Sequence, residues 1–346
     1  MGQHSGYDLL CHYIKANDEQ KHKNIYRTKL AIPVILQRTL NKLFSNLELS
    51  KTYDHNGLIT EIRTLLHFIR KSYDITHVLY VERSLAILSK ILKRKRGKLI
   101  GTVHQPVNLW KNGRHNTDLL SSLDALIILS KQDLKFFDEL LPGRVHFIPH
   151  GIDTNFFKPL NETKFKIKKD NAPRCIFSGV WLRDTKSLAT IVEKVLTIDS
   201  GFRFDILVPE DRRNNPGFDK ISKYKQVFWH SNLSDFQLRS LYQNASMLLL
   251  PMLNCTANNA LLEAIACGLP VVSNNISGIK DYTDKSFADL FPIGDIDSMT
   301  NAVLSLGGNP DKCRHRGLDA RLFAENNFKW QISAAKTIDL YRTLLT

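Results

Sequence analysis

A glutamate just inside the start of a helix is the first feature of this chain that could bind a ligand. A strand is expected over 246–250, a loop of small polar residues follows, and a helix begins near Asn258. The first N–H groups of a helix lack intrahelical partners and lie at the positive end of its dipole, so they suit a phosphate. Glu263, about one and a half turns further on, could accept hydrogen bonds from two ribose hydroxyls. An amphipathic helix with a surface glutamate is the alternative.

Two cations follow another strand, expected over 174–177. Gly179 leaves this strand, and Arg183 and Lys186 stand on either side of Asp184, which is placed to cap the next helix. Such cations can converge on one diphosphate, because arginine offers a bidentate fork and lysine a point charge. Two solvated side chains beside a capped helix would give the same pattern.

Two further places could approach a sugar or a phosphate. His104 follows the strand expected over 98–103, and ligands of open parallel sheets bind beyond the carboxyl ends of the strands. The chain opens with Gly2, Ser5 and Gly6 ahead of an apolar run, and glycines before a helix bring the backbone close to a phosphate. A structural histidine is the alternative for His104. No strand precedes the glycines, so either a first strand is absent or the start lies upstream.

The elements that must position these residues alternate between strands and helices from residue 75 onward. Such alternation predicts parallel sheets covered by helices, the α/β class. Strands are expected over 75–81, 98–103, 124–129 and 145–148, and then over 174–177, 202–207, 227–229, 246–250 and 270–273. The polar, proline-bounded segment 156–173 has the composition of a linker between two α/β units.

Helices are expected between these strands, and capping patterns mark two of their starts. Ser130 with Asp133 predicts a capped helix over 131–140, and Ser234 with Gln237 forms a capping box. The other helices are expected over 84–95, 186–196, 258–267 and 298–306.

Two segments carry a family resemblance. Residues 149–156 read Pro-His-Gly-Ile-Asp-Thr-Asn-Phe, and residues 262–272 read Leu-Glu-Ala-Ile-Ala-Cys-Gly-Leu-Pro-Val-Val. Together with the loops above, they resemble the family 4 retaining glycosyltransferases from about residue 102 to the end of the chain. The resemblance implies the GT-B fold, in which two Rossmann-like domains face a central cleft.

The resemblance also implies where these domains lie. The N-terminal, acceptor-side domain would cover 1–155, and the nucleotide-sugar domain would cover 174–330 after the linker 156–173. The C-terminal helix, 331–346, would cross back to the first domain.

Each candidate residue acquires a role from the resemblance. Glu263 would hold the ribose, and Arg183 and Lys186 would hold the diphosphate. His104 would approach the transferred sugar or the acceptor from the N-terminal domain. The other donor-binding positions would be Gly2, Ser5, Gly6, Gly179, Asn232, Leu233, Thr256, Asn258, Asn259, Ala260 and Leu261.

Three positions depart from the family pattern. Cys255 stands eight residues before Glu263, where the family has a glutamate, so no carboxylate there can contact the donor sugar. Val180 stands where the family has an arginine after Gly179, and His150 stands where the family has an asparagine before Gly151. The choice of donor is therefore open, with a UDP-sugar, and UDP-glucose first, as the expectation.

The expected reaction moves a sugar from this donor to a glycan or lipid-linked acceptor with retention, in bacterial polysaccharide or glycolipid biosynthesis. Fixed cations and a helix N-terminus would stabilise the charge on the leaving diphosphate, so no cofactor and no metal is expected. Asp295 and Asp297 have metal-binding spacing, but their place before a helix favours capping. A nucleotide-sugar epimerase of the same fold and a non-enzymatic, polyanion-binding relative are the alternatives.

Composition restricts the remaining classes of protein. The chain has 346 residues, and 48 Lys and Arg against 34 Asp and Glu give a formal charge of +14. No apolar run approaches the roughly 20 residues of a spanning helix, and the first residues lack the apolar core of a signal peptide. The five cysteines show no CxxC pair, which predicts reduced thiols and a cytoplasmic location.

Two basic stretches set the expected partners. One covers 90–98, and the other has its cations between Lys21 and Lys42. Both are typical of solvated helix faces, or of residues that contact the inner face of an anionic membrane from the cytoplasm. Neither interleaves aromatic residues or accompanies a nucleic-acid-binding motif, so nucleic acid is not an expected partner.

Overall fold

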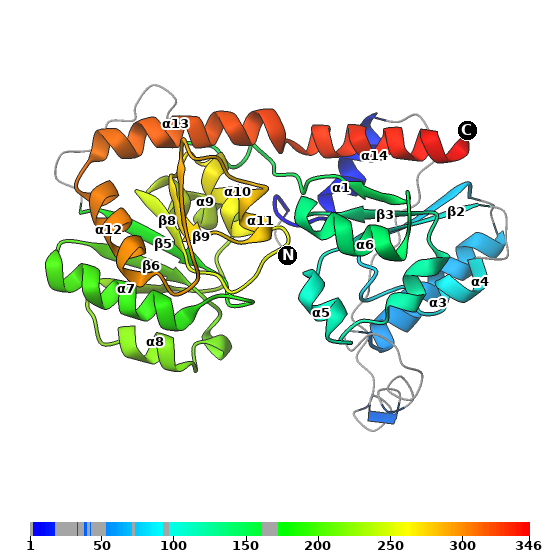
Figure 1. Cartoon of the computed structure of the whole chain (residues 1–346), viewed down its shortest axis with the longest axis horizontal. Helices are drawn as coiled ribbons and strands as arrows, with labels where there is room; N and C mark the ends of the chain where they lie inside the picture. The colour runs from blue at the N-terminus through cyan, green and yellow to red at the C-terminus, as the bar shows by residue number, and fades with distance from the viewer. Residues whose placement is uncertain are drawn as a thin grey trace. The chain divides into compact units, whose positions relative to one another are not determined.

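The computed structural model describes residues 3–17, 33, 38–39, 42, 53–70, 73–92, 97–160 and 172–346. The chain divides into two compact units, each with one parallel sheet (Figure 1). Unit 1 comprises Met1–Leu9 and His150–Ile332, and unit 2 comprises Leu10–Pro149 and Ser333–Thr346. The predicted pair of parallel α/β units is confirmed. The residues before Leu10 group with unit 1, whereas the sequence places them in the first domain.

Unit 2 contains a sheet of four parallel strands in sequential order. The strands are β1 (Ile75–Val78), β2 (Lys98–Val103), β3 (Ala125–Ile128) and β4 (Val145–Phe147). The helices are α1 (Leu9–Asn17), α3 (His55–Arg70), α4 (Leu88–Leu92), α5 (Val107–Lys111), α6 (Leu134–Leu140) and α14 (Trp330–Leu345), with the 3₁₀ turns η1 (Thr117–Ser122) and η2 (Lys131–Asp133). One face of the sheet packs Val103 and Leu126 against Trp110 and Phe137. The Nδ1 atom of His77 on β1 lies 2.6 Å from the hydroxyl oxygen of Tyr341 on α14.

Two predicted helices of unit 2 begin later than the sequence indicates. The helix expected over 84–95 begins at Leu88 as α4, because Glu61 accepts hydrogen bonds from the N–H groups of Ile87 at 2.9 Å and Leu88 at 3.4 Å and so caps a later start; residues 93–95 lie outside the described residues. The predicted cap at Ser130 is wrong as well. The chain first forms the 3₁₀ turn η2, and the buried Ser130 side chain makes no capping hydrogen bond.

Unit 1 contains six parallel strands in the order β10-β9-β8-β5-β6-β7. They are β5 (Arg174–Ser178), β6 (Arg203–Leu207), β7 (Val227–His230), β8 (Met247–Leu250), β9 (Val271–Asn274) and β10 (Ala288–Phe291). The helices are α7 (Thr185–Ile198), α8 (Pro216–Ile221), α9 (Asp235–Gln243), α10 (Asn259–Ala266), α11 (Ser277–Lys280), α12 (Ile296–Gly307) and α13 (Pro310–Asn327), with the 3₁₀ turn η3 (Glu210–Arg212). The sequence predicts five of these strands and misses β10.

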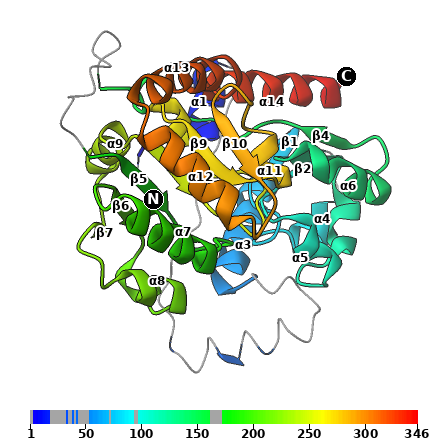
Figure 2. The ribbon, with the colours of Figure 1, turned by 60° about the vertical axis from the view of Figure 1, so that its left-hand side comes forward.

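Helices cover both faces of this sheet (Figure 2). Leucine, valine and phenylalanine side chains of α7, α8 and α12 pack on one face, and those of α9, α10 and α13 pack on the other. The predicted capping box of α9 is confirmed, since Ser234 and Gln237 bond each other's backbone N–H groups. The sheet and its caps therefore fix where each strand-to-helix loop begins.

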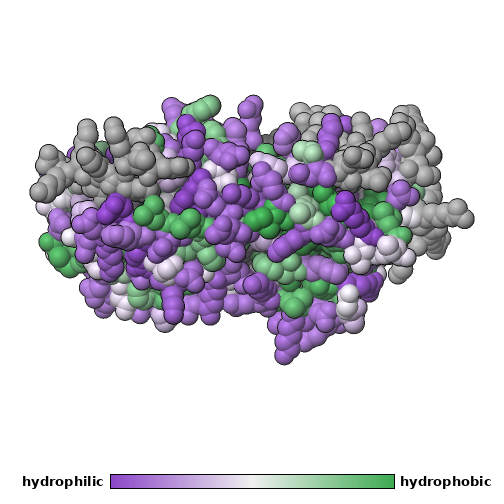
Figure 3. Space-filling model, turned by 90° about the horizontal axis from the view of Figure 1, so that it is seen from above, coloured by the Kyte–Doolittle hydropathy of each residue, from purple (hydrophilic) through white to green (hydrophobic). Residues whose placement is uncertain are grey.

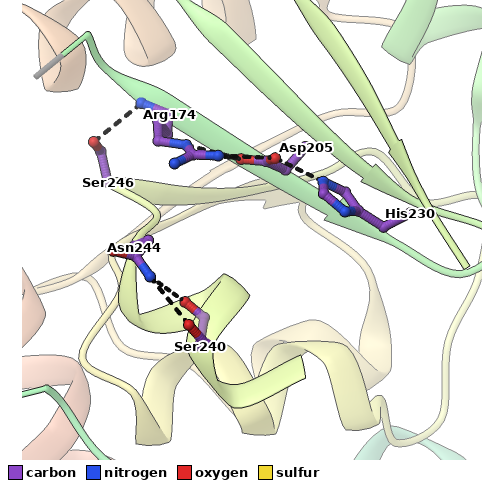
Figure 4. Close-up of polar contacts among 6 residues, drawn as sticks. All are labelled: Arg174, Asp205, His230, Ser240, Asn244 and Ser246. Atoms are coloured by element: carbon purple, nitrogen blue, oxygen red, sulfur yellow. Dashed lines mark hydrogen bonds and ion pairs between the residues drawn. The ribbon is translucent and has the colours of Figure 1, made fainter. Parts of the chain in front are cut away.

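A buried ionic network ties together the strands β5, β6 and β7 (Figure 4). Asp205 of β6, only 1% exposed, accepts two hydrogen bonds from the Arg174 guanidinium at 3.0 and 3.1 Å. The His230 Nε2 atom lies 2.8 Å from the same carboxylate. The carboxylate is thus paired on both sides, as a buried charge must be.

No helix within the described ranges is long and apolar enough to cross a membrane. Figure 3 shows one face on which hydrophilic residues predominate and apolar ones form small separate areas. Most of the basic residues predicted to touch a membrane, among them Lys21, Lys23, Arg27, Lys29 and 93–96, lie outside the described residues. Contact with a membrane therefore stays a prediction. The linker predicted over 156–173 also stays a prediction, because residues 161–171 lie outside the described residues.

Candidate functional site

The start of helix α10 lies where the sequence places it. Asn258 caps the helix, and its Oδ1 atom accepts a hydrogen bond from the N–H of Leu261 at 3.2 Å. Asn258, Ala260 and Leu261 are buried, whereas Asn259 is exposed. Gly268, with φ of +78°, ends the helix in a left-handed conformation, as predicted.

Arg183 is brought to the start of α10 by its own loop. Its Nη2 atom donates to Asn258 Oδ1 at 3.3 Å, and its Nε atom donates to the Ser178 carbonyl at 2.9 Å. The guanidinium lies over Gly179, where an added Cβ would be 2.9 Å from Nη2, and the φ of +94° there also favours glycine. Burial lowers the pKa of Arg183 from its ordinary value. The predicted meeting of these two loops is therefore present.

Backbone contacts hold the two loops together. The N–H of Leu253 donates to the Leu182 carbonyl at 2.9 Å, and the N–H of Asp184 donates to the Pro251 carbonyl at 3.0 Å. Leu182 has a φ of +58°, a conformation that costs a branched side chain about 1 kcal/mol or more. The strain is retained because contacts on both sides of Leu182 determine its backbone.

Lys186 occupies a different environment from Arg183. It lies in the first turn of α7, its side chain is exposed, and no hydrogen bond or ion pair joins it to Asn258 in the described part of the chain. Asp184 caps α7 by accepting from the N–H of Ser187 at 3.0 Å, as predicted. Of the two predicted cations, the structure brings only Arg183 into contact with the start of α10.

Glu263 is a buried carboxylate with a hydroxyl donor on each oxygen. The residue is 4% exposed. Ser5 donates to Oε1 at 2.6 Å, and Tyr242 of α9 donates to Oε2 at 3.0 Å. Burial raises the pKa of Glu263 to about 7, the two hydrogen bonds lower it, and the nearby Asp235 raises it. The carboxylate is therefore poised between its two protonation states near neutral pH.

The N-terminal segment reaches this carboxylate because other contacts fix it to unit 1. The His4 ring stacks on Phe156 with centroids 3.7 Å apart, and its Nδ1 atom lies 2.8 Å from the Asp153 carboxylate. The His4 N–H donates to Asp235 at 3.1 Å. Gly6 follows with a φ of +113°, while Gly2 lies outside the described residues.

The remaining predicted donor residues are more scattered. Asn232 and Leu233 lie in the loop between β7 and α9, where Asn232 has a φ of +51° and is exposed. Thr256 is buried, and its Oγ1 atom finds no hydrogen-bond partner among the described residues. Cys255, in the place of the family glutamate, is buried beside Arg183.

His104 lies in unit 2, directly after β2. Its N–H and that of Gln105 both donate to Oε1 of Glu82, at 2.6 and 2.7 Å. Its ring stacks on Tyr80 with centroids 4.1 Å apart, and its Nε2 atom lies 2.8 Å from the Leu79 carbonyl. Since a carbonyl only accepts, Nε2 carries a proton, and in the neutral ring the lone pair is on Nδ1.

Sequence reasoning misses two residues of these sites. Tyr242 reads as one more apolar position of α9, and Glu82 reads as a loop residue. One sequence feature could have indicated the role of Glu82. It is a carboxylate directly after one predicted strand, and backbone N–H groups at the end of a neighbouring parallel strand could reach it.

The described residues were also considered as possible metal ligands. Within the described ranges, no three His, Cys, Asp or Glu side chains gather as metal ligands would. The prediction that Asp295 is a cap is confirmed, because it caps α12 by accepting from the N–H of Ser298 at 3.2 Å. Asp297 instead pairs with Lys194.

Comparisons with known proteins agree with this architecture. Residues 172–309 match the family described as glycosyl transferases, group 1. The chain is 28% identical over 206 residues to an MMP alpha-(1->4)-mannosyltransferase of Mycolicibacterium hassiacum, a match that covers 58% of this chain and 48% of the relative. The chain thus spans about half the length of that relative.

Two solved structures have the same fold over most of their length. Sucrose-phosphate synthase from Thermosynechococcus elongatus superposes with a TM-score of 0.72 at 16% identity, over 94% of this chain and 85% of that one. Anabaena HepE in complex with UDP superposes with a TM-score of 0.68 at 13% identity, over 82% of each chain. These two structures confirm the predicted GT-B class of two Rossmann-like domains. The match of residues 172–309 to group 1 glycosyl transferases is consistent with the predicted resemblance.

Proposed function

We propose that the chain transfers a sugar from a nucleoside-diphosphate sugar to an acceptor, as the match of residues 172–309 to the group 1 glycosyl transferases suggests. The observation that carries the proposal is the carboxylate of Glu263. It lies in the second turn of α10 with a hydroxyl donor on each oxygen. Two ribose hydroxyls have the same hydrogen-bonding character as these two donors. In the nucleotide complex, a ribose hydroxyl would take the place of Ser5 on Oε1.

The start of α10 supports the diphosphate part of the proposal. Its unpaired N–H groups and the adjacent guanidinium of Arg183 form a positive environment next to Glu263. As the bond between the sugar and the diphosphate breaks, negative charge grows on the leaving group. Fixed positive groups would stabilise that charge more than they stabilise the bound donor, and this difference lowers the barrier.

The finer assignments follow from the resemblance and the named relatives. A UDP-sugar, with UDP-glucose first, is the proposed donor, since one of the structures of the same fold holds UDP. The proposed acceptor is a glycan or a lipid-linked sugar in polysaccharide or glycolipid assembly. Transfer with retention and without a metal belongs to the same proposal, with His104 approaching the reacting sugar from unit 2.

The proposal is tested by calorimetric titration of the chain with UDP-glucose. Glu263→Ala should weaken binding by about 100-fold, because two hydrogen bonds to a charged group are lost. Glu193→Ala is the matched control, since Glu193 pairs with Lys220 and Lys223 on the surface of the same unit. No heat with the unaltered chain would overturn the proposal and favour the polyanion-binding alternative.

The same preparation separates the remaining alternatives. NMR of the product of an acceptor reaction should show the donor's anomeric configuration, and excess chelator should leave the rate unchanged. An epimerase would instead convert the donor with no acceptor present.

A further inference from the structure

We propose that Tyr242 is a positioning residue that orients the carboxylate of Glu263 and keeps it in its charged form for the nucleotide. This inference rests on the proposed function of Glu263. It adds a residue of another helix, α9, to the site. Tyr242 does not touch the nucleotide in this scheme but acts through the carboxylate.

The geometry of Tyr242 suits a permanent role. Its side chain is 0% exposed and packs in the same apolar core as Leu261 and Leu262 of α10. Its ring also lies edge-on to Phe157, with centroids 6.5 Å apart. The hydroxyl therefore approaches Glu263 from the packed core, where solvent and ligand do not compete for it.

The two donors on Glu263 differ in this respect. Tyr242 is fixed within the core, whereas Ser5 belongs to the short N-terminal segment. A carboxylate oxygen has about two lone pairs, so Oε2 can keep the bond from Tyr242 and still accept a ribose hydroxyl. With Oε2 held at 3.0 Å by the phenol, the carboxylate plane is fixed before the nucleotide arrives.

The surroundings of Glu263 explain why its charge needs support. Burial raises its pKa, and Asp235 at the start of α9 raises it further. The thiol of Cys267, at the end of α10, also faces the carboxylate, and burial and Glu263 raise the pKa of that thiol too. The hydrogen bonds from Ser5 and Tyr242 act in the opposite direction. Only the ionised carboxylate is purely an acceptor, so only this form suits two hydroxyl donors.

A further hydroxyl stands behind the phenol. The pKa of Tyr242 is raised well above its ordinary value by burial and by Glu263, while a hydrogen bond from Ser178 lowers it. A donor on the phenol oxygen makes the phenol itself a stronger donor. Ser178 is the last residue of β5, so a series of hydrogen bonds from Ser178 to Tyr242 and on to Glu263 connects this strand with the proposed ribose position.

The test is the pH dependence of UDP-glucose affinity in Tyr242→Phe, measured by calorimetry at several pH values. Losing a hydrogen bond to the ionised carboxylate should raise the pKa of Glu263 by about 1.5 units. The deficit against the unaltered chain should then be about 15-fold at pH 7 and shrink to about twofold at pH 8.5. A UDP-sugar is the correct probe, because free UDP carries a terminal phosphate that itself titrates at about pH 6.

Tyr224→Phe is the matched control. Its hydroxyl donates to the Glu193 carboxylate at 3.4 Å, elsewhere in unit 1, so the variant should bind UDP-glucose as the unaltered chain does at every pH. Should Tyr242→Phe fail to fold, Ser178→Ala leaves the ring packing intact and should give a smaller shift in the same direction.

Two outcomes would overturn the inference. One is a deficit of Tyr242→Phe that is the same at all pH values, which would mark a purely structural loss. The other is an unchanged NMR titration of the Glu263 carboxyl carbon in Tyr242→Phe, a readout that needs no ligand. If the unaltered chain binds no UDP-glucose at any pH, the proposed function fails instead, and the NMR titration still decides the role of Tyr242.

Discussion

Glu82 in unit 2 and Glu263 in unit 1 are both buried carboxylates, and burial raises the pKa of each. They differ in what binds them. Glu82 accepts from two backbone N–H groups, those of His104 and Gln105, whereas Glu263 accepts from the side-chain hydroxyls of Ser5 and Tyr242. A backbone donor cannot leave without unfolding its loop, but a side-chain donor on a short terminal segment, as Ser5 is, can be exchanged for a hydroxyl of a ligand. The partners of a buried carboxylate thus separate a structural role from a binding role.

The largest expected effect is a loss of stability on removing Glu82, and it tests the structural role assigned to this carboxylate. Glu82→Ala leaves the part-buried N–H groups of His104 and Gln105 without their acceptor and removes a buried side chain, so it should lower the free energy of unfolding by about 3 kcal/mol. Urea denaturation measures the loss, and hydrogen exchange should show faster exchange at the amides of His104 and Gln105. UDP-glucose affinity should fall far less than in Glu263→Ala, because the proposed ribose and diphosphate residues lie in unit 1 and Glu82 acts only on the loop of His104.

Glu263→Ala should give the reverse pattern, with a smaller loss of stability than Glu82→Ala and a large loss of affinity. Removing a buried carboxylate whose pKa is raised also removes an ionisation that opposes folding above about pH 4.5. The comparison breaks if Glu82→Ala weakens nucleotide binding as strongly as Glu263→Ala does.

The second expected effect compares the two cations of unit 1. Arg183→Ala removes a guanidinium already in contact with Asn258, so UDP-glucose should bind about 30-fold more weakly. Lys186→Ala removes an exposed ammonium, whose loss should cost about threefold. Calorimetry of both variants measures this ranking. A larger loss in Lys186→Ala would show that the lysine is the closer cation in the nucleotide complex.

These residues also show what sequence reasoning can reach. β2 has the predicted bounds, and the contact between Arg183 and Asn258 could be anticipated, because both follow carboxyl ends of parallel strands. Topology alone brings such loops together. The sequence does not predict β10, because the edge strand Ala288–Phe291 is short and carries an aspartate, so it lacks an apolar run.

The hydrogen-bond partners of Glu263 cannot be predicted from the sequence for a different reason. Ser5 is 258 positions away, and the sequence placed it in the other domain. Tyr242 has the spacing of a core residue of α9, and nothing in that pattern tells which atom its hydroxyl reaches. Long-range side-chain pairs depend on how helices pack, which periodicity does not specify. The sequence therefore predicts Glu263 as a candidate but not the state of its carboxylate.

The smallest expected effect concerns Ser5, whose hydroxyl is the exchangeable member of the pair on Glu263. If a ribose hydroxyl replaces it on Oε1, Ser5→Ala removes a competitor, and UDP-glucose affinity should rise about threefold at a pH high enough to ionise the carboxylate in both proteins, about pH 9.5. Ser231→Ala is the matched control, since Ser231 donates to Glu210 at 3.1 Å on the surface of the same unit and should leave the affinity unchanged. A fall in affinity would instead mean that Ser5 contacts the donor, as the family resemblance implies. The sign of this one change therefore decides whether the N-terminal segment competes with the nucleotide or helps to bind it.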